Sequence, residues 1–254
     1  MTAKPAPIPM NTIIKRFSLN TAGRDLVIGD IHGCFTKALA GLDAVGFDPA
    51  AGDRLFSVGD LVDRGPESKH VLWWLDQPWF AAVQGNHEDM AIRWGRPGCA
   101  MDVELYAMNG GAWNIANTAP ERLAYSDALQ ALPLAIEIET AAGLVGIVHA
   151  DCPFVSWQQF TAALTADQRE AVKEATLWSR DRVKTKDVSG VDGVVAVVVG
   201  HTPQETPRWL GNVLYLDTAA WYRNGAPGRE FAIFDLETLQ PAVRAVSKTG
   251  RSTE

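Results

Sequence analysis

Short apolar runs alternate with amphipathic segments through the first half of the chain, and this alternation predicts strands that are each followed by a helix. The predicted strands are 26–29, 54–59 and 79–85, and the predicted helices are 34–47, about 66–76 and about 87–94. Within the first helix, the spacing places Leu39, Leu42 and Val45 on one face. The β-α-β-α-β order predicts parallel strands joined by crossover helices.

The second half has a different pattern, in which turns separate the strand-like runs. Residues 134–140 and 144–150 alternate around Ala141-Ala142-Gly143, which predicts an antiparallel hairpin. Further strands are predicted at 194–200, 212–218 and 231–236. Both halves fit one α/β fold, in which two mixed β-sheets pack as a central sandwich flanked by helices.

The length of 254 residues is compatible with one large domain, which we place at 23–247. The Pro-rich start, 1–22, predicts a flexible lead-in, and 248–254 predicts a flexible tail. The segment at about 95–132 carries Gly, Pro and short helical pieces, which favours a small cap-like insertion over one edge of the sheets.

Composition excludes several classes of protein. The chain is 47% hydrophobic and 21% charged, as in ordinary globular proteins, and it has no apolar run of about 18 residues that would predict a membrane span. A net charge of −7 without a basic block argues against nucleic acid as a partner. The start lacks a secretory signal, and the three cysteines show no CxxC spacing, so we expect a cytoplasmic protein.

Side chains able to bind metal ions follow five predicted strands directly. They are Asp30 and His32, Asp60, Asn86 with His87, His149, and His201. Asp or Asn at a single such position is more often a loop or cap residue. Here glycines accompany them in GDIHG, GDLVDRG, GNHE and GHT, and ligands of open α/β sheets bind at the carboxyl ends of strands. The set therefore predicts one site.

The chemistry of this set favours a two-metal centre. Asp30 and His32 can hold one ion, and Asn86, His149 and His201 can hold the other, with Asp60 as the bridge. Imidazole, carboxylate and amide ligands favour two divalent ions such as Mn²⁺, with Fe or Zn as alternatives, over Ca²⁺. Such a pair lowers the pKa of a bridging water from about 15.7 toward 7 and supports in-line displacement at phosphorus.

Together with HADCPF, LWSRDR and VVGHTP, the four glycine motifs resemble those of calcineurin-like metallophosphoesterases. More narrowly, they resemble the phosphoprotein phosphatase (PPP) family in its bacterial and phage branch, typified by the phage lambda Ser/Thr phosphatase. The resemblance covers about residues 25–220 and implies the same fold and the same six metal ligands.

The resemblance also implies roles for four further residues. His87 would be the general acid for the leaving alkoxide, and Asp63 would orient and charge-stabilise it. Arg64 and Arg180 would clamp the phosphoryl oxygens, although each could instead form a surface salt bridge. The implied reaction is direct attack on phosphorus by a hydroxide that bridges the two metal ions.

The other polar residues of GNHED, 85–89, could serve either the site or the start of a helix. Asn86 is predicted as a metal ligand, and the alternative is a helix N-cap. Glu88 and Asp89 fit the first helical turn, where carboxylates suit the positive end of the helix dipole, and we place both outside the core site.

Three functions remain open on the sequence. The first is a phosphatase for phosphoserine or phosphothreonine in proteins, and the alternative is a symmetrical diadenosine tetraphosphatase or other nucleotide or small-molecule phosphoesterase. Enzymes of that second type tend toward Ala and Asp at the positions of Asp63 and Glu88. A metal-binding scaffold without activity is the third, but none of the predicted metal ligands or catalytic residues is missing.

The sequence departs from the family pattern at Ala219, where the family often has Gly.

Overall fold

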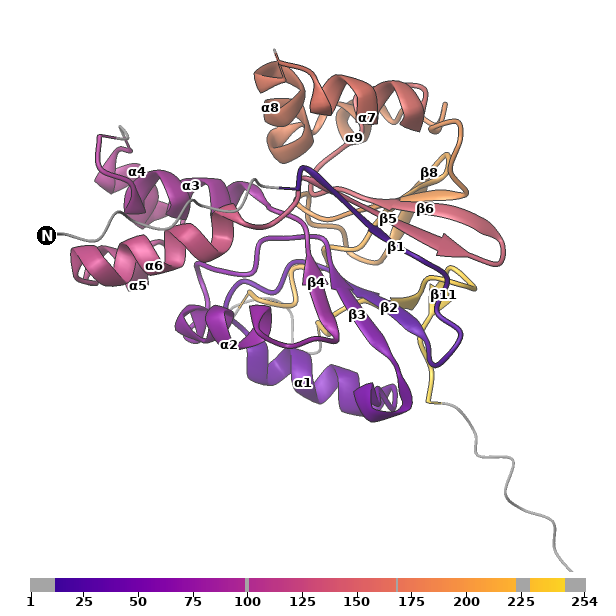
Figure 1. Ribbon diagram of the computed structural model, residues 1–254, viewed down its shortest axis with the longest axis horizontal. Helices are drawn as coiled ribbons and strands as arrows, with labels where there is room; N and C mark the ends of the chain where they lie inside the picture. Colours follow the sequence, from indigo (N-terminus) through magenta and orange to yellow (C-terminus); the bar gives the residue numbers. More distant parts are fainter. Residues whose placement is uncertain (1–11, 99–100, 168, 223–228, 245–254) are drawn as a thin grey trace, which may run out of the picture.

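Two β-sheets lie face to face in the computed structural model, which describes residues 12–98, 101–167, 169–222 and 229–244 (Figure 1). One sheet has six strands in the order β1-β5-β6-β7-β9-β8, and the other has five in the order β11-β10-β2-β3-β4. Each sheet mixes parallel and antiparallel pairs. The predicted α/β sandwich of two mixed sheets is confirmed.

The five-stranded sheet carries the predicted β-α-β-α-β start. Its strands are β2 (Asp25–Ile28), β3 (Arg54–Ser57), β4 (Phe80–Ala82), β10 (Ile233–Asp235) and β11 (Gln240–Pro241). Strands β2, β3 and β4 are parallel. The connections contain α1 (Phe35–Ala44), the 3-10 turns η1 (Pro49–Ala51) and η2 (Ser68–His70), and α2 (Val71–Leu75).

The buried face of helix α1 overlaps the predicted apolar face only at Leu42. Phe35, Ala38 and Leu42 are buried, whereas Leu39 is 44% exposed. The apolar stripe of this helix begins at Phe35 and continues at intervals of three and four residues, and this register leaves Leu39 on the outer side.

The six-stranded sheet contains the predicted hairpin, with Thr140 opposite Gly143. Its strands are β1 (Ile14–Phe17), β5 (Ala135–Thr140), β6 (Gly143–Ile147), β7 (Ala196–Val199), β8 (Arg208–Leu210) and β9 (Val213–Tyr215). Helices α7 (Trp157–Thr165), α8 (Glu170–Trp178) and α9 (Asp181–Thr185) lie on its outer side (Figure 1).

Strand β1 corrects the predicted flexible lead-in at 1–22. It pairs in parallel with β5, with Ile14 opposite Ala135, and Ile14 is buried. Four residues are too few to show a period of two, so the pattern did not reveal this strand. Residues 1–11 and the predicted tail at 248–254 lie outside the described residues.

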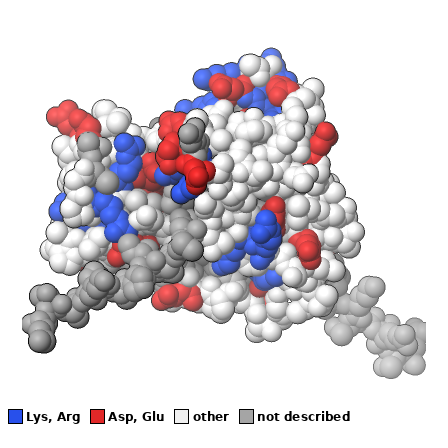
Figure 2. Space-filling view, turned by 45° about the horizontal axis from the view of Figure 1, so that its top comes forward, with Lys and Arg blue, Asp and Glu red and all other residues white. Residues whose placement is uncertain are grey.

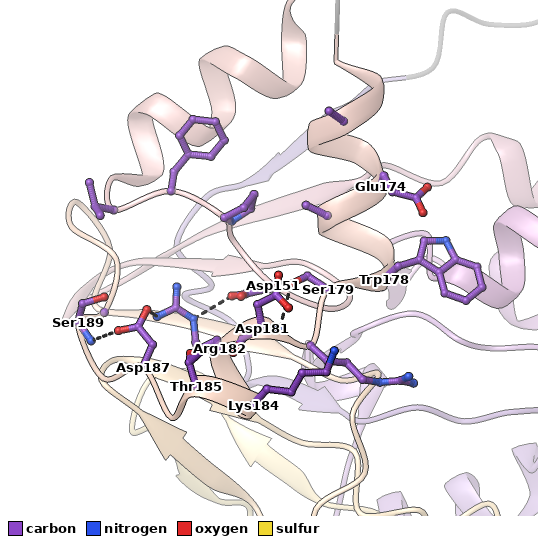
Figure 3. Close-up of a pocket in the computed structure, with 17 residues that line it drawn as sticks. Asp151, Glu174, Trp178, Ser179, Asp181, Arg182, Lys184, Thr185, Asp187 and Ser189 are labelled. Carbon is purple, nitrogen blue, oxygen red and sulfur yellow. Dashed lines mark hydrogen bonds and ion pairs between the residues drawn. The ribbon is translucent and has the colours of Figure 1, made fainter.

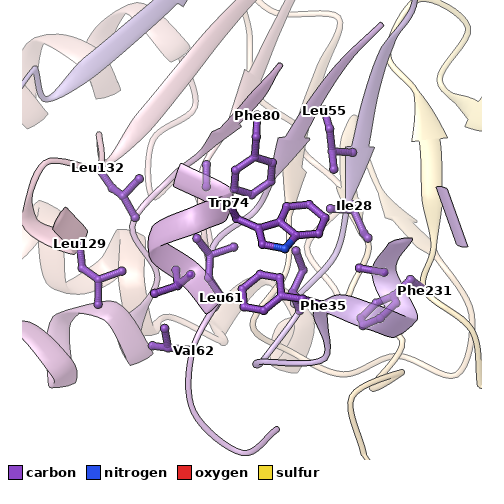
Figure 4. Packing of buried hydrophobic residues seen from close by; sticks show 14 of the residues in the cluster. Ile28, Phe35, Leu55, Leu61, Val62, Trp74, Phe80, Leu129, Leu132 and Phe231 are labelled. Atoms are coloured by element: carbon purple, nitrogen blue, oxygen red, sulfur yellow. The ribbon is translucent and has the colours of Figure 1, made fainter. Parts of the chain in front are cut away.

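Three apolar clusters hold these layers together. Val27, Phe56 and Val198 belong to the cluster between the sheets, which receives side chains from both. A second cluster lies between the five-stranded sheet and its helices, where Trp74 packs against Phe35 and Phe80 with ring centroids 5.1 Å apart in both pairs (Figure 4). A third lies under α7 and α8. Burial on both sides of both sheets makes the strand ends a rigid platform.

The segment predicted as a cap is helical and rests on α3 (Asn86–Gly95). It contains α4 (Val103–Met108), α5 (Ala112–Ile115) and α6 (Ala119–Gln130), which extend together with α3 beside the sandwich (Figure 1). Helix α6 begins at a capping box formed by Thr118 and Glu121, and Ser126 donates a hydrogen bond to the carbonyl of Ile92 at 3.1 Å.

On the face shown in Figure 2, lysine and arginine side chains are scattered among acidic ones. This mixture differs from the continuous basic stripe that a nucleic-acid backbone requires. Within the described ranges, no helix is long and apolar enough to span a membrane.

Candidate dimetal centre

The six predicted metal ligands all lie where strands of the two sheets end. Asp30 and His32 follow β2, Asp60 follows β3, Asn86 begins α3 after β4, His149 follows β6, and His201 follows β7. Parallel pairing within β2-β3-β4 and within β6-β7 brings these ends to one edge of the sandwich. Each of the six residues is at most 5% exposed.

Asp60 lies at the centre of this cluster. Its Oδ2 is 3.5 Å from Nε2 of His32, and its Oδ1 is 3.3 Å from Nε2 of His149. The amide oxygen of Asn86 is 2.9 Å from both Nε2 of His149 and Nδ1 of His201. Two groups of potential metal ligands therefore share the Asp60 carboxylate.

Backbone carbonyls orient all three histidine rings. Nδ1 of His32 faces the carbonyl of Val62 at 2.9 Å, and Nδ1 of His149 faces that of Val58 at 2.8 Å. Nε2 of His201 faces the carbonyl of Trp178 at 3.2 Å. A carbonyl only accepts, so each of these nitrogens carries a proton, and in the neutral ring the other nitrogen directs a lone pair at the cluster.

The second ring nitrogen of His32 gives the clearest sign that a cation belongs here. It is buried and has no hydrogen-bond partner among the described residues, which is costly for a polar atom. The oxygen and nitrogen donors around it fit a divalent transition metal. The side chains present therefore fit a dimetal centre.

The pKa values of the two buried acids Asp30 and Asp60 shift in opposite directions. Burial, with the charges of Asp217 and Asp60, raises the pKa of Asp30 well above its usual range. Although burial opposes it, the neighbouring His149 and His87 hold the pKa of Asp60 well below its ordinary value. So much buried negative charge requires positive charge nearby.

The pKa values of His149 and His201, which share a ligand group with Asp60, also shift in opposite directions. Burial and the charge of His149 lower the pKa of His201 to about 3, and the positive charge of Arg180 acts in the same direction. Against the effect of burial, Asp60 raises the pKa of His149. A ring that stays neutral, such as His201, is suited to bind a metal ion.

Several site residues have a backbone conformation that favours glycine. His32, Asp60, Asp63, Arg64 and His201 have φ of 44°, 50°, 70°, 64° and 63°. This conformation costs roughly 1–2 kcal/mol per non-glycine residue, so the surrounding fold must enforce it. Ala219, where the family often has Gly, also has a positive φ, 52°.

The carboxylate of Glu88 helps to hold the Asp60 loop in this conformation. The sequence predicts that Glu88 lies outside the core site. Its buried carboxylate accepts backbone N–H groups of Asp60 and Leu61, both at 2.8 Å, and of Gly85, also at 2.8 Å. Burial and the charge of Asp60 raise its pKa to about 7. Asp89 instead forms an ion pair with Lys173 at 2.7 Å. Glu88 and Asp89 are both predicted to lie in the first helical turn outside the core site, and of these two residues only Glu88 forms hydrogen bonds with the Asp60 loop.

His87 lies beside the cluster and contacts the residues predicted to act with it. Its Nδ1 donates to Oδ2 of Asp63 at 2.8 Å, and Nη2 of Arg64 donates to its Nε2 at 3.0 Å. Nε2 is also 3.8 Å from Asp60, within reach of the His32 ligand group. A guanidinium at 3.0 Å disfavours a metal ion on the same nitrogen.

Arg64 has a support that the sequence analysis missed. Its guanidinium carbon lies 4.1 Å from the ring centroid of Trp221, and the indole of Trp221 donates to Asp217 at 3.2 Å. Asp217 is a further buried acid at a strand end. The predicted strand at 212–218 included Asp217, whereas β9 ends at Tyr215. Because the strand was predicted too long, Asp217 did not stand out as an acid that follows a strand.

Arg180, the other predicted clamp, is exposed at the start of α9. It lines a cavity of about 630 Å³ between α8, α9 and the loop after β6 (Figure 3). In this cavity Nε of Arg182 pairs with the carboxylate of Asp151 at 2.9 Å. The pair links the loop that follows His149 to the helix that Arg180 begins.

A comparison with protein families identifies the chain's family. The family model for calcineurin-like phosphoesterases matches residues 24–217. The chain belongs to the calcineurin-like phosphoesterase family. It is therefore a phosphoesterase, and the predicted resemblance is confirmed.

Two relatives are similar to the chain in sequence, and one solved structure shares its fold. Serine/threonine-protein phosphatase 1 of Salmonella typhimurium is 38% identical over 198 residues, which are 76% of this chain and 85% of that protein. A symmetrical bis(5'-nucleosyl)-tetraphosphatase of Aromatoleum aromaticum is 49% identical over 63 residues, only 24% of this chain and 23% of that protein. A Saccharomyces cerevisiae protein serine/threonine phosphatase shares the fold, with a TM-score of 0.55 and 16% identity over 80% of this chain and 70% of that one.

Replacing Glu88 by Gln should lower the free energy of unfolding by about 2–3 kcal/mol, because an amide NH₂ would face backbone donors in a buried site. Urea denaturation followed by tryptophan fluorescence measures the change. Asp89→Asn is the matched control on the same helical turn and should cost at most about 1 kcal/mol. Equal effects of the two substitutions would contradict the assignment of Glu88 to the Asp60 loop.

Proposed function

We propose that the protein is a metal-dependent phosphatase for phosphoserine and phosphothreonine residues of proteins. The observation that carries this proposal is that two buried groups of potential metal ligands share the Asp60 carboxylate, and that His87, in the group with His32, is hydrogen-bonded to Asp63. A hydrolase of phosphoric monoesters needs both a source of nucleophile and an acid for the leaving oxygen.

The donor atoms suggest which residues hold each ion. Asp30 and His32 would hold the first, Asn86, His149 and His201 would hold the second, and Asp60 would bridge them. Bound together, two divalent ions would make water acidic enough to supply a nucleophile and would offset charge on the phosphoryl group. Imidazole, carboxylate and amide donors support Mn²⁺, with Fe or Zn as alternatives.

The protein's own side chains would then handle the leaving group. Asp63 holds Nδ1 of His87, so the ring turns Nε2 toward the cluster. When the Arg64 guanidinium moves onto a phosphoryl group, Nε2 is released to hold a proton and to deliver it to the departing alkoxide. Asp63 stabilises the positive charge of the ring while it is protonated.

Arg64 and Arg180 would neutralise the charge on the phosphoryl oxygens. Both side chains are exposed, and neither forms an ion pair with an acid among the described residues. This argues against the alternative of surface salt bridges. Arg64 stacks on Trp221, which orders the planar guanidinium for a bidentate contact.

Aromatic side chains near the site favour a protein substrate over a dinucleotide. Trp221 stacks on Arg64, and Trp113 donates to Asp63 while its ring packs against Tyr125. These rings are engaged with the protein rather than presented for base stacking. Identity supports the same choice: it is 38% over 76% of the chain to a serine/threonine phosphatase, against 25% over 81% of the chain to an asymmetrical bis(5'-nucleosyl)-tetraphosphatase of Bacillus velezensis.

The buried Cys152 thiol suits a reducing compartment, and we place the enzyme in the cytoplasm.

A substrate panel tests this assignment. Protein stripped of metal with a chelator and reloaded with Mn²⁺ should hydrolyse a phosphoserine peptide and p-nitrophenyl phosphate, and should turn over diadenosine tetraphosphate at least about 100-fold less efficiently. Released phosphate and chromatographed nucleotides give the kcat/KM values. A preference for the dinucleotide would replace the protein phosphatase assignment with the nucleotide one.

His87→Asn should reduce turnover of the phosphoserine peptide by about 100-fold or more, because a serine alkoxide leaves poorly without a proton. Turnover of p-nitrophenyl phosphate should fall by less than about 10-fold, since its phenolate leaves readily. The exposed His70→Asn serves as the control and should change neither rate. Equal losses on the two substrates would count against His87 as the acid.

A further inference from the structure

The carboxylate of Asp63 is completely buried, and its two oxygens have different partners. Oδ2 accepts from His87 at 2.8 Å, and Oδ1 accepts from the indole Nε1–H of Trp113 at 2.7 Å. The hydroxyl of Tyr106 is 3.5 Å from the same Oδ1, at the long limit of a hydrogen bond. One of the two short hydrogen bonds on Asp63 therefore comes from the cap.

The indole of Trp113 is held firmly in place. Its ring meets Tyr125 of α6 edge-to-face, with centroids 4.9 Å apart and an interplanar angle of 86°. Asn114, the next residue, donates to the hydroxyl of Tyr106 at 3.2 Å. The donor is thus preorganised by α4, α5 and α6 together, which limits the entropy lost in aiming it at Asp63.

The cap also contacts the neighbour of Asp63. The backbone N–H of Arg64 donates to the carbonyl of Gly110 at 3.2 Å. Gly110 has φ of 99°, and a Cβ there would overlap the backbone of Arg64. The cap and the Asp63–Arg64 loop therefore form one interlocked unit, in which both loop residues keep their positive φ.

We propose that Trp113 is a positioning residue for the acid, an inference that rests on the proposed role of His87. A carboxylate rotates easily about its last torsion, whose preferences are broad. With Oδ1 held by the indole, Oδ2 stays aligned with Nδ1 of His87, and Nε2 stays directed at the leaving oxygen. Without the indole N–H, the Asp63 carboxylate loses this alignment for part of the time.

Trp113→Phe keeps an aromatic ring and removes only the donor. The kcat for the phosphoserine peptide should fall about 10-fold, while the kcat for p-nitrophenyl phosphate stays within about twofold. The urea midpoint should fall, because a buried acceptor loses its donor, but the folded fraction in the assay buffer and the bound Mn²⁺ should match those of the parent protein, which excludes a folding defect. In the His87→Asn background the same substitution should change the peptide rate by less than about twofold, because no acid is left to position.

Trp94→Phe is the matched control. The indole nitrogen of Trp94 is buried without a partner among the described residues, and its ring packs near Tyr106, so its loss should leave both rates unchanged. Equal losses on the two substrates in Trp113→Phe, or an undiminished loss in the His87→Asn background, would overturn the positioning role. If His87→Asn itself treats both substrates alike, the acid role fails first, and this inference falls with it.

Discussion

The crowding of buried lone pairs around Asp60 is the interaction on which the site depends. The amide oxygen of Asn86 faces nitrogens of His149 and His201 at 2.9 Å, and both of these nitrogens are the unprotonated ones if the opposite ring nitrogen donates to a backbone carbonyl. Acceptors that face one another at this distance repel, and burial prevents water from separating them. Two cations would turn this repulsion into coordination, so the arrangement fits a pair of metal ions.

The fold keeps these groups together by combining rigid sheets with strained loops. Each loop that carries a ligand follows a strand buried on both faces, and glycines permit the close approaches: a Cβ on Gly200 would overlap the carboxylate of Asp30. Positive φ values at Asp60 and His201 cost stability that the hydrogen bonds of Glu88 and the packing of the sandwich offset. The cap holds the Asp63–Arg64 loop in the same way, through hydrogen bonds from Trp113 to Asp63 and from Arg64 to Gly110.

Much of this arrangement could be predicted from the sequence, because it depends on local patterns. Apolar runs followed at once by Asp, Asn or His fixed which residues reach the sheet edge, and the structure brings all six predicted ligands together. Long-range contacts left no such pattern. Strand β1 is defined by its pairing with β5, and the exposure of Leu39 depends on how α1 is rotated against its sheet. The partners of Trp113 and Glu88 lie 50 and 28 residues away, so their roles follow only from the folded chain.

The central claim is that Asp60 joins two metal ions in one site. Titration of the metal-free protein with Mn²⁺, followed by electron paramagnetic resonance and elemental analysis, tests it most directly. We predict two ions per chain with a spin-coupled signal, and at most one uncoupled ion in Asp60→Asn. Two uncoupled ions, or coupling that survives in Asp60→Asn, would contradict the account.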